Sequence, residues 1–375
     1  MENLNSVCYV GVINGVKPIE GADNIELVVV NGWSAITKKG EYNENDAVIV
    51  AITDAVIPKE LSDDMGVTGY LRKGQRVRTV KLRGVYSECL IIPMKYLKGK
   101  GSKNVPGTDL MDVLGIQKYE PPVKTIPLEV GGRKIRYHQN PNFHIYYKFP
   151  NQKNVPDMFT EDDPIVITRK LHGTNARYGI VRKNKLSLWD RVKMFFGFKW
   201  SAFEYVYGSH NVEKGSDSQG FYSTDVWRDV ADKYLIKSRL WTHVKTHFKP
   251  QDLEKGFVIY GEIYGAGIQK NYDYGLKDTK FAGFDIEIDG VYQSFFAEKS
   301  HFNLLDLPQV ESLFIGLWSK EKQDQFVFNN FIKGTKIPHE GIVVKHVSGD
   351  RKKVSKVINP DYLIYGEKNN VGDSH

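Results

Sequence analysis

The first hundred residues alternate short apolar runs with polar breaks that contain glycine or asparagine. The runs read VCYVGVI, ELVVV, WSAITKKG and AVIVAI, and the breaks include EGADN and NEND. Short runs rich in β-branched and aromatic residues predict strands, and such breaks predict turns. A further strand pair is predicted at QRVRTVKLRG and ECLIIPM. Five or so strands in about 95 residues favour a small Greek-key barrel, with an OB-fold as the leading candidate.

A change of composition separates this region from the rest of the chain. Residues 98–123 are rich in Gly, Pro and Lys and predict a linker with one short helix near DLMDVLG. Residues 140–358 then mix apolar strands with stretches that we interpret as helical. The strands read DPIVITRK, GFVIYGEIYG, FAGFDIEIDG and EGIVVKHV, and the helical stretches read STDVWRDVADKYLIKSRLWTHV, SHFNLLD and SLFIGLWS. Crossover helices do not follow the strands regularly, so we expect an α+β fold and two domains, residues 1–122 and 123–375.

Charge and cysteine content narrow the class of partner and compartment. The 375 residues include 52 Lys+Arg and 45 Asp+Glu, a net charge of +7. This basic bias favours a polyanionic partner, although it also fits a solvated surface. No apolar run approaches the roughly 20 residues that span a bilayer, and the N-terminus MENLNSVCYV does not resemble a secretory signal. We therefore expect an intracellular protein, cytoplasmic or nuclear, without a membrane partner, in which Cys8 and Cys89 are small buried side chains.

The stretch TRKLHGTN, residues 168–175, places a lysine at the end of an apolar run. Desolvation at such a strand edge would favour the free amine of Lys170, which is the nucleophilic form. Gly173 would let the backbone approach a bulky ligand closely. Because K-x-x-G is a common pattern, an exposed lysine before a turn is the alternative interpretation.

Three later segments carry further candidate chemistry. Glu262 lies inside the apolar run VIYGEIYG, where an unpaired carboxylate is costly to bury, so it should face a cleft unless it lies on the solvent face. Phe284 could stack on a base or belong to the core. Glu340 in PHEGIVVKH could supply a carboxylate to a divalent cation, unless it is only a solvated charge. Cations for phosphate groups could come from Lys345, Lys353 and Lys356.

Taken in order, these segments resemble the motifs of the covalent nucleotidyltransferase superfamily, which includes ATP-dependent ligases and capping enzymes. KLHG resembles the nucleophile motif, YGEIYG the third motif, FAGFDI its aromatic companion, EGIVVK the fourth and KKVSK the fifth. KLHGTN and GEIYGAGIQK are similar to the nick-sealing RNA ligases, and the OB-like domain that precedes them is similar to Deinococcus-type RNA ligases. The N-terminal region also resembles tRNA-binding OB modules.

The resemblance implies an ATP-dependent RNA ligase that joins 3′-hydroxyl and 5′-phosphate ends, with nicked duplex RNA or an RNA/DNA hybrid as its partner. Its second domain would be a nucleotidyltransferase domain of antiparallel sheets with flanking helices, and the protein would be a monomer. Lys170 would form a lysyl–AMP adduct with ATP, and Glu340 would bind Mg²⁺ or Mn²⁺. Glu262 would bind the ribose and Phe284 would stack on adenine. The other candidates for nucleotide binding are Arg169, His172, Gly173, Asn175, Lys345, Lys353 and Lys356.

The sequence departs from the superfamily pattern at several positions. Asn175 stands where DNA ligases carry an arginine, and His172 is a variant of the RNA branch. The fifth motif is usually Lys-x-Lys, which leaves the role of Lys353 open. The motif between the first and the third usually carries an arginine. Its best counterpart, YGSHN, offers only Ser209, His210 and Asn211 as RNA-binding candidates.

The N-terminal domain offers a second set of RNA-binding candidates. The predicted strand QRVRTVKLRG carries alternating cations that could follow an RNA backbone or could be inert solvated charges. These candidates are Arg76, Arg78, Lys81 and Arg83.

Two alternatives to an RNA ligase stay open. One is a DNA ligase or capping guanylyltransferase with the same lysine chemistry, and the other is a non-catalytic OB-fold RNA-binding protein.

Overall fold

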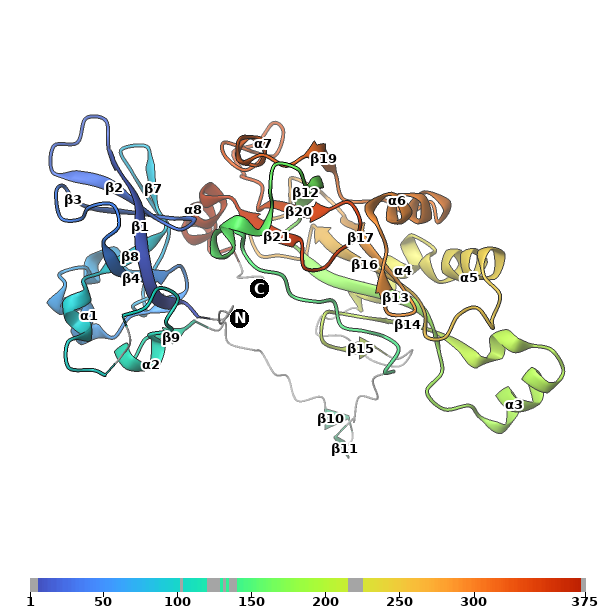
Figure 1. Cartoon of the computed structure of the whole chain (residues 1–375). Helices are drawn as coiled ribbons and strands as arrows, with labels where there is room; N and C mark the ends of the chain where they lie inside the picture. The colour runs from blue at the N-terminus through green and yellow to red at the C-terminus, as the bar shows by residue number, and fades with distance from the viewer. Residues whose placement is uncertain are drawn as a thin grey trace. The chain divides into compact units, whose positions relative to one another are not determined.

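The computed structural model divides the chain into two compact units (Figure 1). The first comprises Met1–Val123 with Pro150–Met158, and the second comprises Lys124–Phe149 with Phe159–His375. The residues that the structure describes are 6–101, 104–119, 129–130, 133–134, 140–214 and 225–371.

The first unit is built on an antiparallel sheet in the order β3-β2-β1-β4-β8. Its strands are β1 (Cys8–Pro18), β2 (Ile25–Val30), β3 (Trp33–Lys38), β4 (Ala47–Ile52) and β8 (Cys89–Ile92). A bulge between Ile13 and Gly15 bends β1, so its first half pairs with β4 and its second half with β2. The Glu88 N–H donates to the Ser34 carbonyl at 2.7 Å, which brings β3 beside the start of β8 and nearly closes the barrel. The predicted OB-fold is confirmed.

Short elements complete the first unit around a core of alternate strand residues. The core contains Val10, Val28, Val50 and Ile92. Cys8 and Cys89 are buried in it as free thiols, as predicted. The predicted helix near DLMDVLG is confirmed as α2. The remaining elements are β5 (Ala55–Val56), β6 (Val80–Leu82), β7 (Val85–Ser87), β9 (Gln117–Lys118), α1 (Lys59–Asp64) and α2 (Met111–Leu114).

The prediction of one strand along QRVRTVKLRG is wrong. Only Val80–Leu82 is a strand there, because the chain turns at Gln75, which has a φ of 63°, and again at Arg83, which has a φ of 46°. Arg76 points inward, where it forms an ion pair with Asp54 and lies 4.0 Å from the ring centroid of Tyr119. A row of cations along one strand is therefore absent from this part of the described chain.

The second unit contains two antiparallel sheets, in the orders β15-β14-β13-β16-β17-β18 and β19-β12-β20-β21. The strands of the six-stranded sheet are β13 (Thr174–Arg182), β14 (Phe203–Gly208), β15 (Glu213–Lys214), β16 (Gly256–Gly265), β17 (Thr279–Ile288) and β18 (Val291–Tyr292). Those of the four-stranded sheet are β12 (Pro164–Lys170), β19 (Ser312–Leu317), β20 (Gly341–His346) and β21 (Val354–Ile358). A separate pair is formed by β10 (Glu129–Val130) and β11 (Arg133–Lys134).

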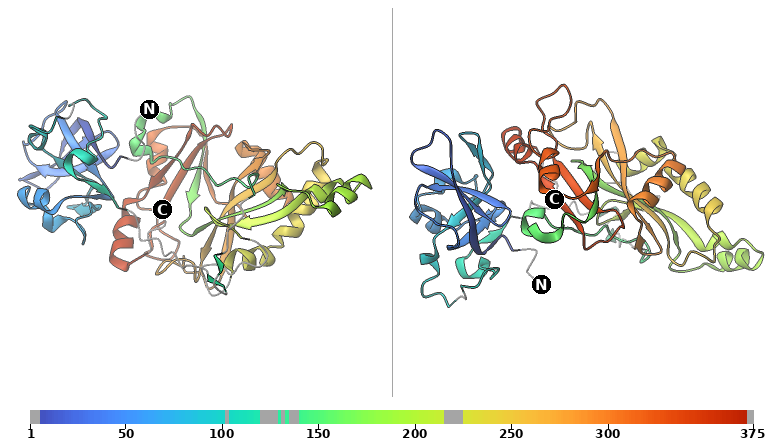
Figure 2. Two further views of the ribbon diagram at one scale, coloured as in Figure 1. Left: turned by 90° about the horizontal axis from the view of Figure 1, so that it is seen from below. Right: turned by 45° about the horizontal axis from the view of Figure 1, so that its top comes forward.

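Helices α4, α5 and α6 pack on one face of the six-stranded sheet (Figures 1 and 2). Tyr178 and Ile259 of the sheet meet Trp227 of α4 and Leu240 of α5 in this core. Because strand residues alternate between faces, Asn175 and Glu262 point to the other face, away from the helices. The helices are α3 (Leu188–Phe195), α4 (Val226–Lys233), α5 (Ile236–His247), α6 (Phe295–Leu304), α7 (Lys320–Gln325) and α8 (Pro360–Asn369). The predicted α+β class is confirmed.

Two of the helix predictions need correction. SLFIGLWS contains β19, which pairs with β12 along the edge of the four-stranded sheet, so backbone pairing overrides the helical interpretation of this short apolar run. STDVWRDVADKYLIKSRLWTHV holds two helices, because Leu235 adopts a left-handed φ of 52° between α4 and α5.

Among the described residues, no helix combines the length and the apolar character needed to cross a bilayer.

A cluster of histidines joins α5 to α6 and should make stability depend on pH. His243 Nε2 lies 3.0 Å from His301 Nδ1, and burial lowers the pKa of His243 to about 4, with His247 and His301 contributing. Between about pH 4 and pH 6.5 the unfolded chain therefore binds more protons at this position than the folded chain, so stability falls as the pH falls. We expect the free energy of unfolding to drop by about 2 kcal/mol from pH 7 to pH 5.

Denaturant titration at both pH values measures this loss. The His243→Asn variant, which is neutral at both pH values, should lose part of its stability at pH 7 but show a smaller difference between pH 7 and pH 5. An unchanged difference in the variant would assign the acid sensitivity to other groups.

Candidate active site

The connection between β12 and β13 brings the KLHG motif against β16. Lys170 ends β12 and Thr174 begins β13, which pairs with β16. A Cβ at Gly173 would lie 2.1 Å from the Ile263 carbonyl oxygen, far inside contact distance. Only glycine allows this approach of backbone to backbone, and the Gln269 side chain locks it by donating to the Gly173 carbonyl at 2.5 Å.

Lys170 and Glu340 form the centre of the candidate site. The Lys170 Nζ donates to Glu340 Oε1 at 2.5 Å, across the pairing of Lys170 with Gly341 on the neighbouring strand β20. The Glu340 side chain is only 4% exposed, and its Oε2 has no hydrogen-bond partner among the described residues. A buried carboxylate oxygen without a partner is costly, so this oxygen is suited to a cation or another donor.

Glu262 and Asn175 face the same space from the six-stranded sheet. The two residues are directly opposite each other in the β13–β16 pairing. Desolvation raises the pKa of Glu262 to about 8, while Lys170 and a hydrogen bond from the Gly173 N–H act in the other direction and Glu340 adds to the rise. The Asn175 Oδ1 is buried and has no partner among the described residues. Glu262 is half-buried at the edge of this space, and its contact with a ligand stays a prediction.

His172 points away from this space. Its side chain is buried against the rings of Tyr272 and Tyr362, and its Nδ1 lies 3.0 Å from the Tyr362 hydroxyl. The Tyr274 hydroxyl accepts a hydrogen bond from the His172 N–H at 2.5 Å. The imidazole thus holds the KLHG turn in place from the side that faces away from this space. Motif analysis gave no signal for these tyrosines.

Phe284 lies on β17 in an aromatic cluster. Its ring centroid is 5.0 Å from that of Tyr146 in an edge-on arrangement, and Tyr146 in turn packs on Tyr260. Phe284 is half-buried, so part of its ring is accessible. Tyr146 comes from the segment before β12, and sequence analysis gave no signal for it.

Lys345 lies in a buried ion network, an arrangement that the phosphate-binding prediction did not foresee. Its Nζ lies 3.2 Å from Asp285 and 3.0 Å from Glu298, and it donates to the Phe284 carbonyl at 2.8 Å. Arg351 pairs with the same Asp285 at 2.9 Å. Burial opposes ionisation of both carboxyls, and it raises the pKa of Glu298, whereas Lys345 and Arg351 hold the pKa of Asp285 below its usual range. In this structure Lys345 therefore binds protein carboxylates, and its contact with a phosphate stays a prediction.

Strand register separates the remaining basic candidates. Lys170 pairs with Gly341, and Lys356 of β21 pairs with Val343, so alternation places Lys356 on the same face of the four-stranded sheet as Lys170. Arg169 lies on the opposite face and pairs with Glu311 at 3.1 Å. Lys353 precedes β21 and forms an ion pair with Asp163. The register therefore favours Lys356 over Arg169 and Lys353 as a neighbour of Lys170.

The segment Ser209–Asn211 connects β14 to β15 and rests on a buried arginine. The Arg177 Nε donates to the Ser209 carbonyl at 2.8 Å, and its Nη1 donates to the Phe143 carbonyl at 2.7 Å. Arg177 is fully buried, and desolvation lowers its pKa to about 10. Burial lowers the pKa of His210, and the same arginine lowers it further. Arg177 is on β13, on the face of Asn175, so an arginine does lie beneath YGSHN although the motif contains none.

The basic candidates of the first unit are distributed over several elements. Arg76 is buried and paired, as described above, which removes it from the predicted RNA-binding row. Arg78 donates to the Tyr70 carbonyl at 3.0 Å, and Lys81 donates to the Tyr86 hydroxyl at 2.8 Å. Lys81 and Arg83 are exposed on the β6–β7 hairpin.

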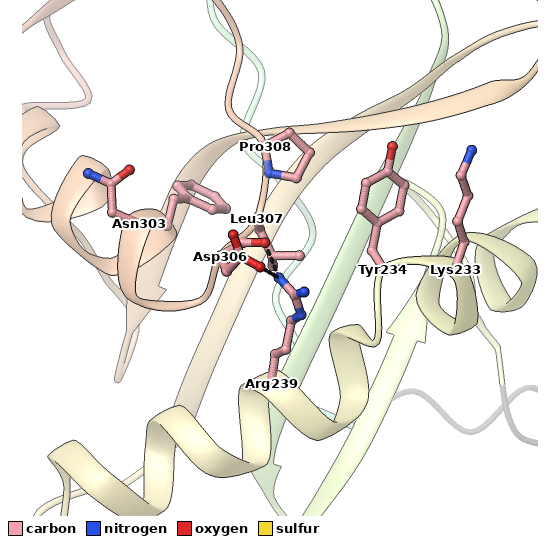
Figure 3. Close-up of a pocket in the computed structure, with 8 residues that line it drawn as sticks. Lys233, Tyr234, Arg239, Asn303, Asp306, Leu307 and Pro308 are labelled. Carbon is pink, nitrogen blue, oxygen red and sulfur yellow. Dashed lines mark hydrogen bonds and ion pairs between the residues drawn. The ribbon is translucent and has the colours of Figure 1, made fainter.

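A separate pocket of about 510 Å³ lies beside the corner between α4 and α5 (Figure 3). Arg239 points into it and pairs with Asp306 at 2.8 Å. The residues that line it are Lys233, Tyr234, Arg239, Phe302, Asn303, Asp306, Leu307 and Pro308. None of the predicted site residues is among them, so the candidate site does not depend on this pocket.

The residues around Lys170 fit a divalent cation that also contacts a bound nucleotide. Mg²⁺ usually keeps several waters and takes one or two carboxylates plus substrate phosphates, rather than a full set of protein ligands. The unpartnered Glu340 Oε2 matches that mode. Within the described part of the chain, no group of three or more His, Cys, Asp or Glu side chains could hold a metal alone.

Comparison with known proteins gives two family matches. The model described as RNA ligase matches residues 163–358, and one described as an OB-fold domain matches residues 7–94. No curated protein matches.

Solved structures of the RNA ligase of Naegleria gruberi are similar over nearly the whole chain. A mutant without ligand is 22% identical, with a TM-score of 0.70, and the match covers 97% of this chain and 98% of that chain. A mutant with ATP and Mn is 22% identical, with a TM-score of 0.70 and coverage of 96% and 99%. The same ligase with PPi is 22% identical, with a TM-score of 0.69 and coverage of 97% and 99%. At this identity the likeness establishes the fold.

Proposed function

Because the chain belongs to the RNA ligase family, we propose that it uses ATP to join 3′-hydroxyl and 5′-phosphate ends of RNA, at nicks in duplexes. The observation that carries this proposal is the meeting of Lys170, Glu340 and Glu262 at the β12–β13 connection. An amine nucleophile beside two carboxylates suits nucleotidyl transfer, which depends on positioning and on neutralised phosphate charge.

The reaction would proceed in three displacements. The free amine of Lys170 attacks the α-phosphorus of ATP, so that a P–N bond forms and the bond to pyrophosphate breaks. The 5′-phosphate of the RNA then attacks the same phosphorus, which frees the lysine and leaves AMP on the RNA end. Finally the 3′-hydroxyl attacks the adenylated 5′-phosphate and expels AMP. Glu340, which accepts a hydrogen bond from Lys170 Nζ, would orient the amine, and the ammonium proton passes to solvent before the first step.

The residues around the lysine would divide the binding of ATP among themselves. Glu262 and Asn175 would bind the ribose hydroxyls, because both present acceptors to the space in front of Gly173. Phe284 would stack on adenine with its accessible face. Lys356 would contact the α-phosphate from the face that it shares with Lys170. Glu340 would hold Mg²⁺ or Mn²⁺, and such a cation supplies neutralisation of the phosphate charge.

The neighbours support the choice of nucleotide and metal. Structures of the Naegleria gruberi ligase hold ATP with Mn and AMP with Mn, and the fold of this chain matches theirs over nearly its whole length. We therefore propose ATP as the nucleotide. The AMP moiety would be the covalent adduct.

Two assays test the proposal. The protein is incubated with labelled ATP or GTP and Mg²⁺ or Mn²⁺, denatured, and examined for covalent label. It is then given nicked duplexes with RNA or DNA on each side of the nick. We expect label from ATP and sealing when the 3′-hydroxyl strand is RNA. No label under any metal condition would identify a non-catalytic RNA-binding protein, label from GTP alone a capping enzyme, and sealing of DNA strands alone a DNA ligase.

The exposed cations of the β6–β7 hairpin should contribute to substrate binding. In the double variant Lys81→Glu and Arg83→Glu we expect nick sealing to fall about tenfold at low salt, because two contacts to the phosphate backbone are lost. Lysine adenylylation should stay within twofold of the unmodified chain. The pair Lys59→Glu and Lys95→Glu, also exposed on the first unit, is the charge-matched control. Equal sealing by both double variants would exclude a specific role for the hairpin.

A further inference from the structure

An insert between two paired strands carries an unusual surface. β13 ends at Arg182 and β14 begins at Phe203, and these two residues pair directly. Paired antiparallel strands need only a short turn, yet residues 183–202 intervene here. They form α3 (Leu188–Phe195) and a turn of 3₁₀-helix, Lys199–Ala202, and the views in Figures 1 and 2 show α3 projecting from the end of the six-stranded sheet.

The helix is amphipathic, but its apolar side faces outward. Leu188, Trp189 and Phe195 are 79%, 74% and 86% exposed. With Val192 and the C-cap residue Phe196 they occupy positions i, i+1, i+4, i+7 and i+8, which form one face of a helix. We call these five residues the apolar face of α3. A surface helix normally buries such a face, whereas here the opposite side, with Asp190 and Met194, packs on the protein.

Specific contacts hold the helix in this orientation. Ser187 and Asp190 form a reciprocal capping box at its start, and Lys183 pairs with Asp190 at 2.7 Å. Trp200 anchors the end of the insert, with its ring 5.2 Å from Phe203 and 6.3 Å from Trp241. The apolar face of α3 is therefore presented outward by an ordered scaffold and is not a loose segment.

The charges of the insert are arranged around this face with one sign. Residues 183–202 contain five basic residues and a single acid, Asp190, which is buried against Lys183. The exposed charges that remain are all positive. They belong to Lys185, Arg191, Lys193 and Lys199.

We propose that the insert is a membrane-surface anchor, which places the apolar face of α3 at the boundary between headgroups and acyl chains of a bilayer containing anionic lipid. A helix with Trp, Phe and Leu on one face and Lys and Arg around it is the combination that binds such surfaces. Anionic headgroups complement the four exposed cations, while the acyl boundary accepts the exposed rings. The site lies outside the candidate active centre, and the proposal is independent of the proposed ligase activity.

Charge and shape favour this occupant over two others. A second copy of the chain would bring two sets of like charges together, which is unfavourable. RNA would satisfy the cations and could stack on aromatic rings, but it offers no apolar environment for Leu188 or Val192. A bilayer containing anionic lipid accommodates both the apolar and the basic part of the insert.

Flotation of the full-length protein with lipid vesicles tests the proposal. Vesicles of phosphatidylcholine alone are compared with vesicles that contain one-fifth phosphatidylglycerol. We expect at least tenfold stronger partitioning onto the anionic vesicles, weakened by high salt. The double variant Trp189→Glu and Phe195→Glu and the double variant Arg191→Glu and Lys193→Glu should each lose at least tenfold. The matched controls, the pair Phe296→Glu and Leu304→Glu for exposed apolar residues on α6 and the pair Lys237→Glu and Lys245→Glu on α5, should stay within twofold of the unmodified chain.

Each other outcome overturns the proposal. Absence of partitioning onto anionic vesicles, or equal partitioning by insert variants and controls, would exclude a lipid-binding role for the insert. Self-association that is measured by light scattering and lost in Trp189→Glu and Phe195→Glu, without vesicle binding, would identify a second copy as the occupant. Loss of RNA binding in the same variant, again without vesicle binding, would identify RNA. Circular dichroism and denaturant titration confirm that every variant is folded.

Discussion

Replacing Lys170 by alanine should abolish covalent labelling by ATP, with any residual adenylylation at least about a thousandfold below that of the unmodified protein. The reason is chemical, because Lys170 is the amine that lies beside Glu340, at 2.5 Å, and it would form the P–N bond. Sealing of nicked RNA with ATP should disappear as well. The label is measured on denatured protein, and sealing on a gel.

A second substitution separates the chemistry from the fold. Lys170→Arg retains a cation beside the buried Glu340, which would otherwise lose its partner, but a guanidinium is not a nucleophile at neutral pH. It should be as inactive as Lys170→Ala, but its free energy of unfolding should be closer to that of the unmodified protein. Both variants should still seal RNA that is already adenylated at its 5′ end, because that step needs no lysine nucleophile. Retained labelling in Lys170→Arg would refute Lys170 as the site of the adduct.

Gly173→Ala should cause the second largest loss. A Cβ at this position would lie 2.1 Å from the Ile263 carbonyl oxygen and 3.0 Å from the Glu262 Cγ. The β12–β13 connection must then move away from β16, which separates Lys170 from Glu262. We expect adenylylation to fall at least about a hundredfold and the free energy of unfolding to fall by about 2 kcal/mol or more, as for overpacking in a core.

Gly366→Ala is the matched control for this substitution. Gly366 lies in α8, and the nearest atom to a Cβ there is Val371 Cβ at 3.7 Å, an ordinary contact. Alanine in the helix should leave adenylylation unchanged and raise stability by up to about 1 kcal/mol. If Gly173→Ala behaved like Gly366→Ala, the close approach would not be essential.

The sequence was sufficient to predict elements whose signal is local. Turn residues and short apolar runs predicted the OB-fold, and the order of the motifs predicted that Lys170, Glu262 and Glu340 belong together. Lys170 and Glu340 are 170 positions apart in the chain but are brought together by the pairing of β12 with β20.

Sequence analysis missed the partners of residues that contact a distant element. Asp285 on β17 and Glu298 on α6 could not be placed beside Lys345 from the sequence. Arg76 was assigned to RNA because Asp54 and Tyr119 could not be placed beside it from the sequence either. The amino-acid sequence gives the type of a charged side chain but not its neighbours in space. Those neighbours decide whether the side chain binds a ligand or another part of the protein.

The expectation that no membrane takes part rested on the length of apolar runs. That criterion addresses only segments that cross a bilayer. The insert with α3 has eight helical residues and mixes apolar with basic positions, so a search for long apolar runs passes over it.

The buried ions around Lys345 determine how the two sheets of the second unit can move. Lys345 belongs to β20 in the four-stranded sheet, whereas Asp285 belongs to β17 in the six-stranded sheet, so this contact fastens the two sheets to each other. Pulling them apart would leave buried charges without partners, at a cost of about 3–5 kcal/mol for each broken pair. The two sheets should therefore move together as one rigid body.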